Sequence, residues 1–209
     1  ELAPREAGYH NSLGEARRAL GDAEEAGACY ARALELAPDY AAACYNLGLL
    51  RQGQGRRDEA ISCYRRAIAL GLQVPMAHNN LGVLLQTQGK IGEAIDCFQE
   101  ALKLNAADAD ALNNLGCARR DLGQLDEATA CYRRALELAP QNADVASNLL
   151  LTLQYRPGVT PAELAAAHGE YDRIHAAPLR AFQRKHENTP DPNRPLRLGF
   201  VSADFKRHP

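Results

Sequence analysis

Amide side chains at a fixed interval are the clearest candidates for chemistry in this chain. An asparagine directly precedes a leucine at four positions 34 residues apart: Asn46, Asn80, Asn114 and Asn148. An amide offers both a donor and an acceptor, which suits a peptide backbone whatever its side chains are. We predict that these four asparagines bind peptide. The alternative is that they are tolerated, solvated residues inherited with a duplicated unit.

Cysteines share this interval and could at first indicate a disulfide or zinc framework. The recurring positions are Cys29, Cys63, Cys97 and Cys131, and no C-x-x-C pair occurs. Equivalent helices in neighbouring units lie about 8–10 Å apart, whereas a disulfide needs Cα atoms within about 7 Å. We interpret all six cysteines of the chain as packing residues in a reducing, cytoplasmic compartment.

Other chemistry is poorly supported by the composition and motifs. The net charge is −2 with acids and bases interspersed, which argues against nucleic acid. No apolar run approaches the roughly 20 residues of a membrane helix. Five histidines lack metal-ligand spacing: His10, His78, His168, His175 and His186. We therefore expect no metal and no cofactor in this chain.

The interval of 34 residues belongs to a repeated unit. Leu-Gly pairs occur at Leu13-Gly14, Leu47-Gly48, Leu81-Gly82 and Leu115-Gly116. An Ala-x3-aromatic-x2-Ala pattern follows each pair, with its aromatic at Tyr30, Tyr64, Phe98 or Tyr132. This spacing predicts two helices per unit, joined by a glycine-containing turn, with small residues allowing close approach and the aromatic filling the space between them. One unit cannot bury its apolar face alone, so the stack is the stable object.

These residues resemble the tetratricopeptide repeat family. The resemblance implies an all-α, right-handed solenoid with repeats at 7–40, 41–74, 75–108 and 109–142, a partial repeat at 143–156, and residues 1–6 as the tail of a preceding repeat. It also implies that the first helix of each unit, which carries the asparagines, lines a concave groove for polypeptides. The family's tryptophan slot departs from the pattern, holding His10, Cys44, His78 and Leu112.

The repeats end in a different sequence. Thr160-Pro161 is typical of a helix start, and we predict a capping helix within 157–186 that shields the last apolar face of the array. Its apolar positions recur at helical spacing: Leu164, Ala167, Tyr171, Ile174 and Leu179. A polar, proline-rich linker at 187–195 precedes a predicted strand at 196–202.

Residues 196–209 read LRLGFVSADFKRHP and resemble the opening of the catalytic domain of protein O-linked N-acetylglucosamine transferases, the family that includes the SPINDLY proteins. This implies a parent enzyme that transfers N-acetylglucosamine from UDP-N-acetylglucosamine to Ser or Thr of proteins, with GDP-fucose as an equally compatible donor. By the same resemblance His208 is a catalytic-site residue, in an incomplete site, so this segment alone is not expected to be active. In that family the asparagines hold the backbone of the target.

A non-catalytic scaffold or chaperone-type adaptor is the alternative function. Adaptors that clamp a C-terminal carboxylate need several basic residues on the inner face. Lys90 and Lys103 fall instead in a turn and on the second helix of their unit, which disfavours a carboxylate clamp.

Overall fold

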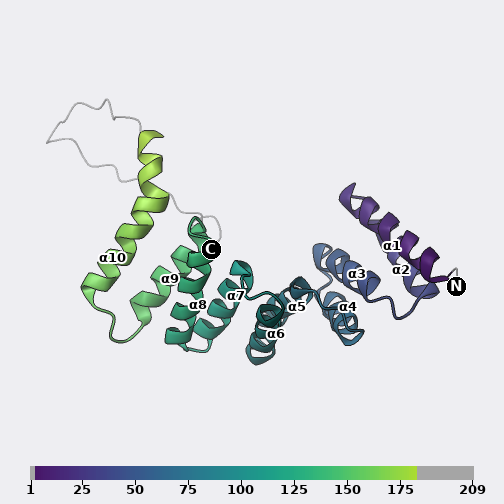
Figure 1. The fold of residues 1–209 in the computed structure, drawn as a ribbon, viewed down its shortest axis with the longest axis horizontal. Helices are drawn as coiled ribbons and strands as arrows, with labels where there is room; N and C mark the ends of the chain where they lie inside the picture. The colour runs from purple at the N-terminus through teal and green to yellow at the C-terminus, as the bar shows by residue number, and fades with distance from the viewer. Residues whose placement is uncertain (1–2, 183–209) are drawn as a thin grey trace, which may run out of the picture.

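The computed structural model describes residues 3–182, which form ten α-helices followed by two short helical segments (Figure 1). The first helices of the successive units are α1 (Ala3–Ala19), α3 (Ala41–Gly53), α5 (Pro75–Thr87), α7 (Ala109–Asp121) and α9 (Ala143–Tyr155). The second helices are α2 (Ala23–Leu36), α4 (Arg57–Ala69), α6 (Ile91–Leu104) and α8 (Leu125–Leu138). The predicted all-helical array is confirmed.

The two helices of each unit pack closely because a glycine on the first helix faces an aromatic ring on the second. A Cβ atom built on Gly82 would lie 2.6 Å from the nearest atom of the Phe98 ring, and the same closeness recurs in every full unit. The rings of Tyr30, Tyr64, Phe98 and Tyr132 are fully buried, with 0% exposure. The predicted close approach is therefore real, because each ring occupies the space that a side chain on the first helix would fill.

The turn between the two helices depends on a second glycine. Gly89, between α5 and α6, has a φ of 76°, and the corresponding turns contain glycines with similar positive values. Such a conformation costs other residues energy, and here it reverses the chain within a few residues.

The array curves because its two layers pack differently between units (Figure 1). Each second helix contacts the first helix of the next unit, and first helices also contact one another directly, α1 with α3, α5 with α7, and α7 with α9. The helices α3 and α5 make less direct contact than these pairs, but α4 packs against α5 as extensively as α2 packs against α3, and a shared buried core continues through this junction. Direct contact among first helices places them on the inner side of the curve.

The first helix includes part of the segment at 1–6 that the sequence assigns to the tail of a preceding repeat. It begins at Ala3 and continues without a break to Ala19, and the assignment of the tail stays a prediction. A proline at the first turn, Pro4, explains why the helix can start there, since the missing N–H has no intrahelical partner at that position.

The capping helix forms as predicted at its start but not at its end. Thr160 Oγ1 accepts a hydrogen bond from the Glu163 backbone N–H at 3.1 Å, and α10 (Pro161–Tyr171) packs against α9. The chain then continues as a π-helical segment (Asp172–Ala176) and a 3-10 segment (Ala177–Phe182). Pro178 lacks the N–H that an α-helix needs here. Leu179 was expected to pack but is 62% exposed.

The predicted linker at 187–195, the strand at 196–202 and the rest of 196–209 lie outside the described residues. Within residues 3–182, each helix is too short or too polar to span a lipid bilayer.

Gly82→Ala should destabilise the protein by about 1–3 kcal/mol, since the added methyl group overpacks the contact with Phe98. Gly92→Ala in α6 is the matched control, because a Cβ there meets nothing within 4 Å, and it should not lower stability. Urea unfolding followed by circular dichroism measures both, and equal losses would contradict the packing role of Gly82.

Candidate peptide-binding surface

Three of the four predicted asparagines lie between neighbouring first helices and bond to an asparagine of the preceding unit. Asn114 Nδ2 donates to Asn79 Oδ1 at 3.0 Å, and Asn148 Nδ2 donates to Asn113 Oδ1 at the same distance. In each pair the two residues are 35 positions apart. The prediction placed these amides on the inner helices; it did not anticipate that they also join the units.

The same bond forms at the first junction and buries its asparagine. Asn46 Nδ2 donates to Asn11 Oδ1 at 3.0 Å and to Glu15 Oε1 at 2.9 Å, and Asn46 is 6% exposed. Both N–H groups of Asn46 therefore bond to the preceding unit, so this residue joins the two units and is poorly placed to contact a peptide.

These amide–amide bonds between successive first helices form a ladder, and the ladder is interrupted between the second and third units. Tyr45 stands where Asn11, Asn79 and Asn113 stand in other units, so Asn80 has no amide oxygen to accept its N–H there. Asn80 lies instead near the Tyr64 hydroxyl. Burial raises the pKa of Tyr64, and the hydrogen bond with Asn80 partly offsets this by lowering that pKa. Apolar packing continues across this junction, where Tyr45 packs against the core cluster that contains Tyr64 and Leu81.

Two ladder asparagines retain hydrogen-bonding groups for a ligand. Asn80 and Asn114 are half-buried, and within the described residues Asn114 uses one N–H group and leaves its oxygen without a protein donor. Asn148 is more fully engaged, because it also contacts Cys117 Sγ at 3.6 Å and accepts from Arg120 at 3.2 Å. The asparagines in the middle of the array are thus the ones most available to a ligand.

Further side chains extend the surface along the first helices. Gln86 Nε2 on α5 donates to Asp121 Oδ2 on α7 at 2.8 Å, one helical turn or more beyond the asparagine in each helix. This bond is a second polar contact between α5 and α7 beside the asparagine bond.

Burial shifts the pKa values of four thiols and one histidine of the array towards their neutral forms. It raises the pKa of Cys44, Cys63 and Cys131, and that of Cys97 to about 11, so these cysteines remain thiols near neutral pH. All six cysteines are free. Burial also lowers the pKa of His78, against the effect of Glu100.

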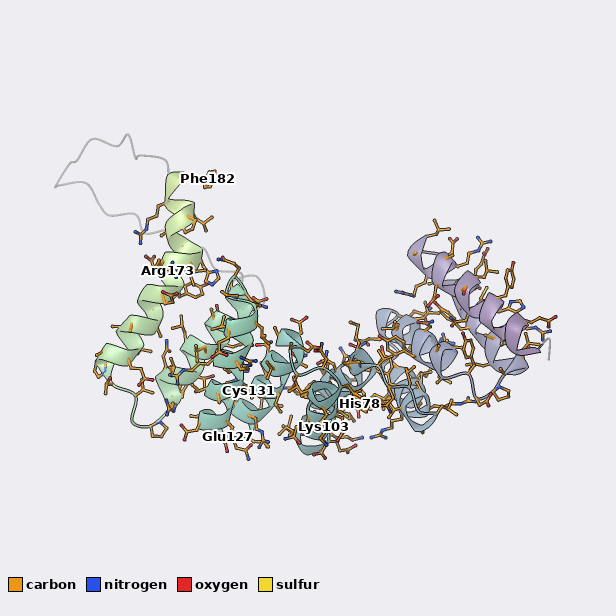
Figure 2. The ribbon with its side chains drawn as sticks, in the orientation of Figure 1. His78, Lys103, Glu127, Cys131, Arg173 and Phe182 are labelled. Carbon is orange, nitrogen blue, oxygen red and sulfur yellow. The ribbon has the colours of Figure 1, made fainter. Side chains whose placement is uncertain are left out.

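Basic residues are placed as the sequence indicated. Lys90 is at the N-terminus of α6, and Lys103 lies on α6 at the outer edge of the array (Figure 2), where its Nζ is 2.5 Å from Glu100 Oε1. His208 lies outside the described residues. In the described part of the chain, no group of three His, Cys, Asp or Glu side chains could hold a metal ion.

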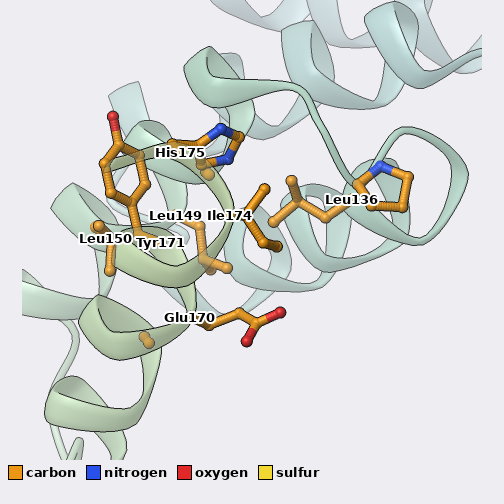
Figure 3. A pocket seen from close by; sticks show the side chains of 10 residues that line it. Leu136, Leu149, Leu150, Glu170, Tyr171, Ile174 and His175 are labelled. Carbon is orange, nitrogen blue, oxygen red and sulfur yellow. The ribbon is translucent and has the colours of Figure 1, made fainter. Parts of the chain in front are cut away.

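A small apolar cavity of about 180 Å³ lies where the capping segment meets α8 and α9 (Figure 3). It is lined chiefly by aliphatic side chains, with Tyr171 and His175 from the capping segment. His175 Nε2 is buried without a hydrogen-bond partner. This cavity belongs to the contact between the array and its cap and is separate from the amide ladder.

A double-mutant cycle on Asn79→Ala and Asn114→Ala should give a coupling energy on the order of 1 kcal/mol, the net contribution of one hydrogen bond. A parallel cycle on Tyr45→Phe and Asn80→Ala should give coupling near zero, since the ladder bond is missing there. Urea denaturation of the single and double variants supplies the energies. Equal coupling in the two cycles would show that the ladder bond contributes nothing.

Comparison with known proteins is consistent with this geometry. The tetratricopeptide repeat family matches residues 5–73, 45–107 and 73–141, while no curated protein matches the chain. Among solved structures, YrrB, described as a tetratricopeptide protein with an unusual peptide-binding site, is 24% identical with a TM-score of 0.72, covering 83% of this chain and 90% of its own.

Two further structures share the fold. The MamA protein is 22% identical with a TM-score of 0.75, covering 89% of this chain and 98% of its own. The first tetratricopeptide domain of Spaghetti, solved with an HSP90 peptide, is 30% identical with a TM-score of 0.53, covering 55% of this chain and 91% of its own. The family match spans more than half of the residues and agrees with the helix pairs, so the chain belongs to the tetratricopeptide repeat family.

Proposed function

We propose that the chain is a protein-binding module whose inner helices hold an extended segment of another polypeptide. The observation that carries this proposal is the row of amides on adjacent first helices, in which Asn80 and Asn114 are half-buried and keep hydrogen-bonding groups. An amide pairs with a peptide C=O or N–H regardless of sequence. The peptide-binding sites described for YrrB and Spaghetti support this reading.

The energy of such contacts indicates weak, broad binding. Each amide contact should contribute on the order of 1 kcal/mol net, and the total must offset the cost of ordering a flexible peptide. We expect dissociation constants of roughly micromolar to millimolar for single segments. That range suits an adaptor that serves several partners.

Asn80→Ala/Asn114→Ala should weaken peptide binding about tenfold or more, because two hydrogen bonds are lost. The probe is a fluorescein-labelled peptide selected from a random, unstructured 12-residue library panned on the wild-type protein, with affinity read by fluorescence anisotropy.

Gln141→Ala removes an exposed amide in the turn before α9 and is the matched control; it should leave the affinity unchanged. Unchanged affinity in the double asparagine variant, with its fold intact by circular dichroism, would remove the two asparagines from the proposed site.

A more specific function would make this array the substrate-recognition arm of a protein O-glycosyltransferase. It is supported by the run at 196–209, including His208, which resembles the start of that catalytic domain. The test is transfer of labelled sugar from UDP-N-acetylglucosamine, and in parallel from GDP-fucose, to acceptor peptides by the intact gene product. Absence of transfer from both donors would leave the adaptor function.

A further inference from the structure

Charge is unevenly distributed along the inner helices. Helix α5 contains no Asp, Glu, Lys or Arg, and α3 contains only Arg51, whose Nε lies 3.3 Å from Glu59 Oε2 on α4. The flanking inner helices α1 and α7 both carry acids and bases, including Glu15, Arg18, Arg120 and Asp121. Helices α3 and α5 themselves therefore contribute almost no charge to the inner surface, and the nearest carboxylates, Glu15 and Asp121, come from α1 and α7.

Apolar side chains accompany the available amide in this middle part. Met76, in the first turn of α5, is 58% exposed, and Asn80 and Val83 follow at helical spacing on the same face. Leu49 occupies in α3 the position that Val83 has in α5, and both are half-buried against the core. Aliphatic groups thus flank Asn80 along one stripe.

The interrupted ladder adds an aromatic side chain to the same place. Tyr45 is half-buried, and its ring centroid lies 5.8 Å from that of Tyr64. Since Tyr45 and Leu49 stand on α3 and Asn80 and Val83 on the neighbouring α5, this junction offers an amide, an aromatic ring and aliphatic groups together.

The length of the uncharged part sets the length of segment that it fits. Neighbouring helices lie about 8–10 Å apart, and an extended peptide advances about 3.3 Å per residue, so two units face roughly five or six peptide residues. A charged side chain buried against α5 would lose water and would find no counter-ion on that helix, which is costly. The charge that reaches this junction is that of Arg18 on α1, which acts on Tyr45 and Tyr64.

From this juxtaposition we propose, resting on the function proposed above, that α3 and α5 select an extended polypeptide segment whose central residues are uncharged and include aliphatic side chains. Charged residues of the partner lie outside this centre, where α1 and α7 supply both signs of charge. The preferred partner is an internal, unfolded segment and not an acidic chain terminus.

The first test sequences the peptides that a random 12-residue library yields after panning on the wild-type protein. The inference predicts depletion of Asp, Glu, Lys and Arg over a central window of about five residues, relative to the input library. Enriched peptides with charged centres, or with a shared acidic C-terminus, would overturn it and leave peptide binding standing. Failure to enrich any peptide would refute the proposed function, and this inference with it.

The second test places a charge on the neutral stripe. Met76→Lys should weaken binding of a selected neutral peptide by about tenfold, and should improve binding of a twin peptide carrying a central glutamate. Leu104→Lys is the control, because Leu104 is a 38% exposed leucine at the end of the outer helix α6. It should change neither affinity.

Equal affinities of the two lysine variants for both peptides would overturn the assignment. A dimer in light scattering that Met76→Lys dissociates and Leu104→Lys does not would show that a second copy of the chain covers this surface, and would also overturn the inference.

Discussion

In every full unit an aromatic ring of the second helix packs directly against a glycine of the first helix, which has no side chain to displace the ring. The rings that face these glycines are fully buried, and the glycines are Gly14, Gly48, Gly82 and Gly116. Because protein interiors are close-packed, this contact sets the separation of the two helices. The helix pair is thereby a rigid block, and the inner surface exists because such blocks are stacked one after another.

A second interaction joins the blocks on their inner side. The asparagine ladder connects the first helices through hydrogen bonds of 3.0 Å at three of the four junctions. Amides that bond to each other partly protect their partners from water, and this leaves a smaller set of groups for a ligand. The same type of side chain therefore both joins the units and is proposed to bind the ligand. Asn46 is buried and serves the junction, whereas Asn80 and Asn114 are half-buried and can also reach a ligand.

The sequence predicts the interior of a unit better than the relation between units. The period of 34 residues identifies Gly82 and Phe98 as partners, because their spacing along one helix pair is a local property. The Asn79–Asn114 bond depends on how neighbouring helices are juxtaposed, which the period alone does not give. A signal was present in the doublets Asn79-Asn80 and Asn113-Asn114, and in Tyr45 as the exception. Leu179 fits the helical spacing, but Pro178 changes the helix type just before it.

The missing rung between α3 and α5 has a mechanical meaning. Units one and two are joined by the ladder, as are units three, four and five, whereas units two and three are joined by a shared apolar core that includes Tyr64, Leu81 and Leu84. Bending at this junction breaks no amide–amide bond, whereas bending at the other three does. A partner that bonds to Asn80 across this junction would supply the missing polar link, and it would thereby reinforce the array at the one inner junction, within the described residues, that has no amide–amide bond.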